Sequence, residues 1–263
     1  MQVREVINVM NYFLLLWFLF TRPTWAWQLV WFSSYNPANS YKRHVKRFQE
    51  YEQYELPLVE VLQRTSKARE EINYILEESR RFVVTKDCES SLIPARFDAS
   101  IELGQICYSL VRLTKPSNVV ETGVGRGVTS HFILRALEEN RKGRLYSIEL
   151  PPLRLGARKE VGKFVPASLV SRWRLIFGPG VREMKKLQGE IKNIDIFVHD
   201  SNHSYLNQLA EYQIALKWLK KDGILISDDV ENDALLEAIE KYGGKIMVTK
   251  QSKPRYIGII IKS

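Results

Sequence analysis

The feature that most constrains the fold is the stretch at residues 119–130, which reads VVETGVGRGVTS. Two valines lead to Glu121, glycines follow at positions 123, 125 and 127, and an apolar helical pattern begins near residue 128. Glycine permits left-handed backbone and lets a ligand approach without a Cβ in the way. A helix that begins there directs its free amides toward whatever the loop binds. The stretch predicts a strand, a ligand-binding loop and a helix, although a tight turn that binds nothing has the same pattern.

The spacing of the glycines separates two classes of ligand. A dinucleotide-binding loop has the pattern G-x-G-x-x-G, whereas position 128 here is Val128 and the third glycine comes one residue early. The pattern E-x-G-x-G-x-G resembles the first motif of class I S-adenosylmethionine (SAM) methyltransferases. A second acidic residue, Glu149, ends the next apolar run, where a carboxylate can accept hydrogen bonds from both hydroxyls of a ribose. We therefore expect SAM to be bound by Glu121, Thr122, Gly123, Gly125, Gly127 and Glu149.

From about residue 98 the chain alternates helical and strand patterns, which predicts a parallel sheet with helices on both faces. Helices are expected at 99–113, 128–140 and 205–220. Strands are expected around 119–120 and at 145–149, 173–177, 194–198, 223–227, 245–250 and 256–262. The expected fold is α/β, with a Rossmann-like seven-stranded mostly parallel sheet and an N-terminal hydrophobic helical extension. The match of seven strands and a final hairpin to a methyltransferase sheet is implied by the resemblance.

Acidic residues stand where the expected strands end. In open parallel sheets, ligands bind beyond the carboxyl ends of the strands. The sheet itself needs no carboxylates there, although one or two of them could cap the helices that follow. The clustering predicts a binding site at this edge, formed by Glu121, Glu149, Asp200, Asp228 and Asp229.

Two of these strand ends narrow the resemblance. Residues 194–205, IDIFVHDSNHSY, and 223–230, GILISDDV, resemble the small-molecule O-methyltransferase family that includes cephalosporin hydroxylase-type and macrolide-sugar methyltransferases. The run YSIELPP at 146–152 fits the same group. The resemblance covers about residues 95–263, and its motifs are more specific for fold and cofactor than for substrate.

The resemblance implies that Asp200, Asp228 and Asp229 hold Mg²⁺, which prefers hard oxygen ligands. The ion would lower the pKa of an acceptor hydroxyl. The alternative is that Asp228 caps a helix and only Asp200 is catalytic. His203 follows Asp200 by three residues and is a candidate general base, although a histidine at a helix start is also common as a cap or surface residue. His199 is expected to be structural, because its side chain should point away from that of Asp200.

The first 47 residues are apolar and basic. They hold six basic residues and one acidic residue, and so contribute +5 to the formal net charge of +9. Residues 6–20 form an apolar run whose helix would reach only about 22 Å, less than the roughly 30 Å hydrocarbon core of a bilayer. Tryptophans and flanking basic residues favour the headgroup region. Three interpretations stay open: a membrane anchor, a signal peptide cleaved near Ala26, and a buried or oligomer-forming helix.

The chain divides into three expected parts. Residues 1–40 are a membrane-anchoring segment, 41–94 a helical linker, and 95–263 a SAM-dependent methyltransferase domain. The excess of Lys and Arg after the apolar run places this domain in the cytoplasm. Two cysteines, Cys88 and Cys107, are too few for a disulfide framework and are expected to be buried.

These features predict a membrane-associated SAM-dependent O-methyltransferase that transfers a methyl group to a hydroxyl of a small or lipid-linked, sugar-like acceptor. A nucleic-acid methyltransferase is suggested by the sequence pI of about 9.4. It is disfavoured because the basic excess lies mainly outside the expected catalytic domain, and because no [NDS]-P-P-[YF] tetrad follows the strand at 194–198. A membrane-tethered SAM-binding protein without turnover is the other alternative. A homo-oligomer stays open.

Overall fold

A computed structural model gives the fold and describes residues 49–65, 69–82, 91–150, 156–252 and 255–263. Within these ranges, no helix combines the length and the apolar character needed to cross a membrane. The predicted anchor at residues 1–40 lies outside the described residues, as does Cys88.

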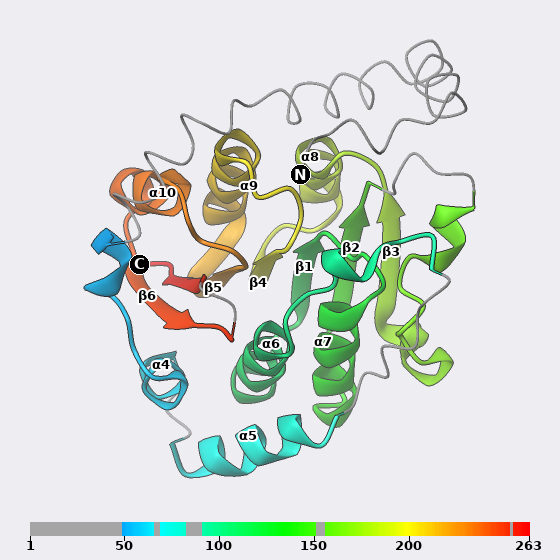
Figure 1. The fold of residues 1–263 in the computed structure, drawn as a ribbon, viewed down its shortest axis with the longest axis horizontal. Helices are drawn as coiled ribbons and strands as arrows, with labels where there is room; N and C mark the ends of the chain where they lie inside the picture. The colour runs from blue at the N-terminus through cyan, green and yellow to red at the C-terminus, as the bar shows by residue number, and fades with distance from the viewer. Residues whose placement is uncertain (1–48, 66–68, 83–90, 151–155, 253–254) are drawn as a thin grey trace.

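Seven strands form one sheet in the order β3-β2-β1-β4-β5-β7-β6 (Figure 1). The first five pair in parallel, whereas β7 runs antiparallel to both β5 and β6. The expected mostly parallel sheet with a final hairpin is thereby confirmed. The strands are β1 (Asn118–Thr122), β2 (Arg144–Glu149), β3 (Trp173–Phe177), β4 (Ile194–His199), β5 (Leu219–Ser227), β6 (Lys245–Lys250) and β7 (Tyr256–Ile261).

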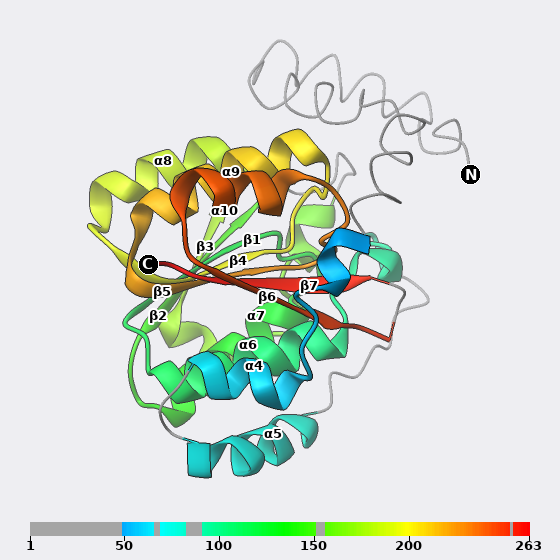
Figure 2. The same ribbon diagram turned by 90° about the vertical axis from the view of Figure 1, so that its left-hand side faces the viewer.

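Helices cover both faces of the sheet (Figure 2). One face carries α4 (Leu58–Thr65), α5 (Ile72–Arg80), α6 (Ile101–Thr114) and α7 (Val128–Glu139). The other carries α8 (Gly180–Glu190), α9 (Tyr205–Trp218) and α10 (Ala234–Tyr242). The expected helices at 99–113, 128–140 and 205–220 correspond to α6, α7 and α9, while α8 and α10 were not among the expectations.

Successive residues of the central strand serve opposite cores. Val119 packs into the core under α6 and α7, and Val120 packs into the core under α8 and α9, because side chains alternate across a strand. Both valines are fully buried, as is typical of a parallel sheet covered on both faces. The sheet therefore holds its strand ends, and the residues that follow them, in fixed relative positions.

Helices α4 and α5 belong to the core of the sheet. Val61, Leu62, Ile72 and Ile75 are buried in the same cluster as α6. Helix α4 begins directly after Pro57. The packing of α4 and α5 is therefore continuous with that of the sheet. The division of the chain at residue 94 stays a prediction.

Candidate active site

The glycine loop, residues 123–127, turns from β1 into α7 against the end of β4. Gly123, Gly125 and Gly127 have φ values of +83°, +51° and +91°, in the left-handed region that favours glycine. A Cβ on Gly123 would lie 2.0 Å from the carbonyl oxygen of Asp200. The absence of a side chain at Gly123 brings the loop and Asp200 together at one edge of the sheet.

Glu149, at the end of β2, holds this loop. Its Oε2 accepts hydrogen bonds from the amides of Val124, at 2.6 Å, and Gly125, at 2.9 Å. Burial raises the pKa of the Glu149 carboxyl, and the two amide donors oppose that shift. The structure therefore places the carboxylate predicted to bind ribose directly beside the glycine loop.

Glu121 and Thr122 lie beneath the loop, inside the sheet. Oε2 of Glu121 accepts from the hydroxyls of Ser130 and Ser147, each at 2.6 Å. Burial raises the pKa of Glu121 to about 7, and its Oε1 is buried without a hydrogen-bond partner among the described residues. The Thr122 hydroxyl donates to Glu211 at 2.6 Å. Contact of either residue with a cofactor stays a prediction.

Two predicted metal ligands come together with the predicted base. One ligating atom from each of Asp200, His203 and Asp228 lies within 4.8 Å of the others. Burial raises the pKa of the Asp200 carboxyl, and the neighbouring charge of Asp228 raises it further. Burial also raises the pKa of Asp228, whose Oδ1 accepts from Gln251 at 2.8 Å. Two carboxyls in this position favour either a shared proton or a bound cation.

Asp229, the third predicted metal ligand, has a different environment. Its carboxylate pairs with Arg255 and lies 3.1 Å from Nδ1 of His203. Burial would raise the pKa of Asp229, but the hydrogen bond with His203 and the charge of Arg255 outweigh it, and the pKa is lowered. The backbone of Asp229 is left-handed, at φ 46°. Among the described residues, the group that could hold a metal ion contains His203 with Asp200 and Asp228, and the role of Asp229 as a ligand stays a prediction.

His203 lies between carboxylates. Its Nε2 is 3.9 Å from Oδ1 of Asp200, while Nδ1 faces Asp229, and the side chain is 26% exposed. Burial would lower the pKa of His203, but the hydrogen bond with Asp229 and the charge of Asp228 raise it. Asp229 can therefore orient the imidazole through Nδ1, while Nε2 faces Asp200.

His199 forms a buried network behind this cluster. Its Nδ1 lies 2.8 Å from Oε2 of Glu211, which also accepts from Ser201 at 3.1 Å. Burial lowers the pKa of His199, and the hydrogen bond with Glu211 opposes that shift. Because a carboxylate accepts, the geometry has Nδ1–H of His199 donating to Glu211. His199 faces α9 and Asp200 faces α7, the opposite directions that strand alternation predicts.

Four residues that shape the site were not predicted from the sequence. Glu211 carried a usable signal, since it is an acidic residue within the helical pattern at 205–220. Gln251 and Arg255 reach the cluster from the β6–β7 connection, and no local pattern indicates that approach. Phe177 lies beside Glu149 in the pairing of β2 and β3, and the guanidinium of Arg158 lies 4.1 Å from its ring centre.

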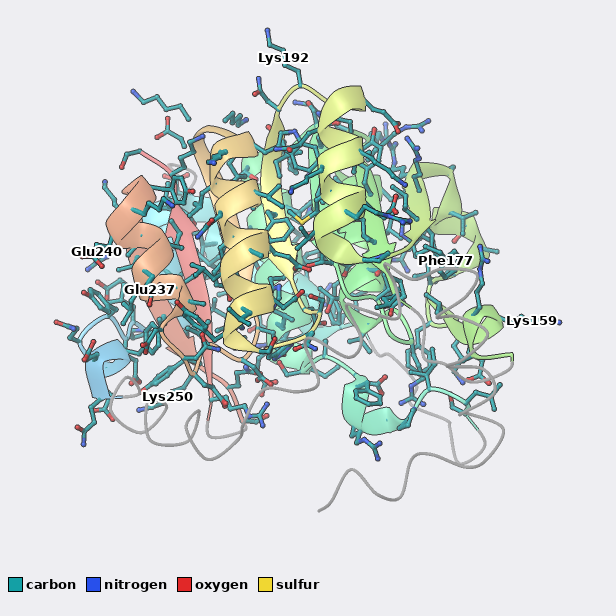
Figure 3. The ribbon with its side chains drawn as sticks, turned by 90° about the horizontal axis from the view of Figure 1, so that it is seen from above. Lys159, Phe177, Lys192, Glu237, Glu240 and Lys250 are labelled. Atoms are coloured by element: carbon teal, nitrogen blue, oxygen red, sulfur yellow. The ribbon has the colours of Figure 1, made fainter. Side chains whose placement is uncertain are left out.

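Figure 3 shows how the two ends of the sheet differ. Phe177 and Lys159 lie on the side of β3, and Glu237, Glu240 and Lys250 lie on the side of α10 and β6. The aromatic ring next to Glu149 is therefore on the β3 side of the glycine loop, and the acidic cluster is on the side of β5.

Comparison with known proteins agrees with this geometry. Residues 120–230 match a model described as a methyltransferase domain. The match includes the glycine loop, Glu149, and the cluster of Asp200, His203 and Asp228. Among curated proteins, none matches this sequence.

Several solved structures share the fold. A putative O-methyltransferase from Klebsiella pneumoniae has a TM-score of 0.54 at 18% identity, over 81% of this chain and 99% of that chain. An O-methyltransferase from Bacillus cereus, in complex with SAH, has a TM-score of 0.51 at 18% identity, over 73% and 91%. The O-methyltransferase TomG from Streptomyces achromogenes, involved in tomaymycin synthesis and in complex with SAM, has a TM-score of 0.50 at 17% identity, over 81% and 99%. At these identities the likeness shows the fold.

Proposed function

We propose that the chain, whose residues 120–230 match a model of a methyltransferase domain, is a SAM-dependent enzyme that methylates a hydroxyl oxygen of a small or lipid-linked, sugar-like acceptor. One observation carries the proposal. The glycine loop with Glu149, and the cluster of Asp200, His203 and Asp228, lie beyond the carboxyl ends of neighbouring parallel strands of one sheet. A methyl donor and an acceptor hydroxyl would meet at that edge. The O-methyltransferase names of the similar solved structures support the choice of oxygen as acceptor.

The residues present fit SAM. The left-handed glycines leave room for a ligand against the backbone, and the amides at the start of α7 point toward the loop. Glu149 stands at the end of β2, where a ribose diol needs an acceptor. Oε1 of Glu121, which has no hydrogen-bond partner in the described part of the chain, lies under the same loop. SAM supplies an electrophilic methyl group on a sulfonium.

The carboxyls of Asp200 and Asp228 also fit a divalent cation. Burial raises the pKa of both carboxyls, and the charge of Asp228 raises that of Asp200 further, which a cation between them would relieve. His203 completes the group, since Asp229 is engaged by Arg255. Mg²⁺ held there would act as a Lewis acid toward the acceptor hydroxyl. An imidazole among the donors is less typical of Mg²⁺ than a third oxygen.

The chain's own residues can move the proton. In the absence of a cation, Nε2 of His203, which faces Asp200, can accept a proton from the acceptor hydroxyl, while Asp229 holds Nδ1 and Arg255 holds Asp229. The hydroxyl oxygen forms a bond to the methyl carbon as the carbon–sulfur bond breaks. S-adenosylhomocysteine then leaves, and the proton remains on His203.

The acceptor class and the location are proposed from the sequence. The apolar and basic residues 1–47 would hold the enzyme at an anionic membrane surface, where a lipid-linked acceptor is concentrated. The cephalosporin hydroxylase-type group, a cytoplasmic orientation and a homo-oligomer belong to the same proposal. A nucleic-acid acceptor has no observation in its favour beyond the basic composition.

Chelation tests the cation and the enzyme separately. When lipid and polar extracts supply the acceptor, excess EDTA should abolish the formation of S-adenosylhomocysteine from SAM, and added Mg²⁺ should restore it. SAM affinity measured by calorimetry should stay the same, because the glycine loop and Glu149 are not part of the cluster. Asp200→Asn and Asp228→Asn should reproduce the loss, with Glu139→Gln as an exposed control. Full activity in EDTA would remove the cation and leave His203 as the base, and failure to bind SAM would overturn the proposed function.

A further inference from the structure

Arg126 is a fully buried charge inside the glycine loop. Its Nε donates to Oδ1 of Asp98 at 2.7 Å, and a terminal nitrogen pairs with the other carboxylate oxygen. The side chains of Arg126 and Asp98 are 0% and 1% exposed. A buried guanidinium needs such a bidentate partner, since an unpaired charge in the interior is strongly unfavourable. Because it is buried, Arg126 acts through its position in the loop rather than by contact with solvent or substrate.

Asp98 belongs to a segment that lies outside the matched methyltransferase domain. We call residues 91–100 the strap. A Cβ on Gly125 would lie 3.2 Å from the carbonyl oxygen of Phe97, so the strap lies directly against the loop. The strap ends where Ser100 caps α6 by accepting from the amide of Leu103. The loop is thereby connected through Asp98 to a rigid helix.

A second segment, residues 156–165, holds the other side of the loop. The amide of Gly162 donates to the carbonyl of Gly125 at 3.0 Å, and the amide of Phe164 donates to that of Arg126 at 2.9 Å. The Phe164 ring lies 4.9 Å from the Arg126 guanidinium carbon. Arg126 therefore contacts both segments that enclose the loop.

The two segments are also joined to each other. The amide of Leu92 donates to Glu160 at 2.9 Å, and the hydroxyl of Ser91 donates to the same carboxylate. Strap, loop and the 156–165 segment thus form one hydrogen-bonded assembly. Asp98 is the charged contact that joins the strap to the loop itself.

We propose that Asp98 and Arg126 are a positioning pair for SAM, which holds the glycine loop in the conformation that binds the cofactor. The inference rests on the proposed function, because it takes SAM as the ligand of the loop. Without the pair, the loop has more conformations to lose on binding, and cofactor affinity falls. The effect should be reciprocal, since a contact that strengthens SAM binding is itself stabilised by SAM.

Calorimetry on the full chain tests the pair. Asp98→Asn should raise the Kd for SAM roughly 5–150-fold, the range typical of coupled sites, and should raise the KM for SAM with little change in kcat at saturating SAM. Phe97→Ala is the matched control, since it alters an exposed neighbour in the strap. Glu78→Gln removes the ion pair with Arg112 between α5 and α6 and controls for loss of stability away from the loop. Both controls should bind SAM as the wild type does.

A second variant covers the case in which Asp98→Asn fails to fold. Replacing a buried ion pair by apolar residues often preserves stability, so Asp98→Leu combined with Arg126→Met should fold and still bind SAM weakly. SAM should also slow amide hydrogen exchange across the strap in the wild type, and less so in the double variant. Folded variants with wild-type Kd would overturn the positioning role. Absence of SAM binding by the wild type would instead overturn the proposed function.

Discussion

At the scale of single residues, identical side chains differ through their neighbours. Asp228 and Asp229 are adjacent, yet burial raises the pKa of the first, while His203 and Arg255 lower the pKa of the second. Glu121 has only two hydroxyl donors, and burial brings its pKa to about 7. The chemistry of each carboxyl therefore depends on contacts made by residues distant in the chain.

Glu121→Gln should change how stability depends on pH. The folded pKa of about 7 lies above the ordinary glutamate value of 4.5, so the folded state binds the proton more tightly. The associated stability is present below pH 4.5 and is lost as pH rises through about 7. The shift corresponds to about 3 kcal/mol in the free energy of unfolding. Relative to wild type, Glu121→Gln should gain up to that amount between pH 5 and pH 8, measured by chemical denaturation.

The exposed Glu139→Gln provides the comparison and should show no such trend relative to wild type. A difference between Glu121→Gln and wild type that stays constant from pH 5 to pH 8 would contradict a raised pKa at Glu121.

The sequence indicated the acidic residues at the strand ends, because their type and position are local properties. It did not indicate which of them meet. Asp229 was expected to hold the cation because the resemblance implies it, and in the structure Arg255, from the β6–β7 connection, pairs with its carboxylate. Such a contact depends on the sheet order, which no pattern near Asp229 contains.

At the scale of elements, strands were easier to predict than helices. β3 and β6 have the predicted bounds, because short apolar runs between turn residues are distinct signals. Helix α8 lacked such a signal, since it begins after Gly178 and Pro179 and buries only Glu183, Met184 and Leu187. Helix α10 has a helical spacing of apolar residues, in its buried Ala234, Leu235 and Ala238, although it was not predicted.

Gly180→Ala should weaken the contact between α8 and α9. A Cβ there would lie 2.2 Å from Oε1 of Glu211. That carboxylate cannot move freely, because Thr122 and His199 hold it from two strands. We expect a loss of about 1–3 kcal/mol in the free energy of unfolding, as is typical of overpacking.

Gly189→Ala is the matched control in the same helix. A Cβ at Gly189 meets nothing within 4 Å, so alanine should stabilise α8 by roughly 0.5–1 kcal/mol. Urea denaturation of the two variants should give shifts of opposite sign. If Gly180→Ala were as stable as Gly189→Ala, the Glu211 side chain would be able to move away from the added Cβ without loss of stability.

At the scale of the whole molecule, the sheet and its glycine loop were predictable from local patterns, and the surface against which the preceding helices pack was not. Residues 41–94 were expected to be a helical linker, and this division of the chain stays a prediction. Within these residues, α4 and α5 share the core under α6, on a surface formed by residues far along the chain. The resemblance implied a final hairpin, but not that β7 lies between β5 and β6.

The described N-terminal contacts define what a truncation should do. Tyr51 is fully buried and its hydroxyl donates to the carbonyl of Asn232 at 2.8 Å. The amide of Leu56 donates to the carbonyl of Val248 at 2.9 Å. The chain therefore packs against the sheet domain from Tyr51 onward. Deleting residues 1–40 leaves both contacts, whereas deleting residues 1–56 removes both.

The shorter deletion should leave a folded protein with wild-type affinity for SAM, and it should abolish sedimentation with vesicles that contain anionic lipid. The longer deletion should lower the thermal unfolding temperature, because α10 and β6 lose the packing of Tyr51 and Leu56. Calorimetry, thermal denaturation and vesicle sedimentation measure the three properties on the same preparations. If the full chain stays in the supernatant when the vesicles sediment, the membrane role of residues 1–40 is wrong. If the shorter deletion unfolds, those residues are part of the folded domain instead.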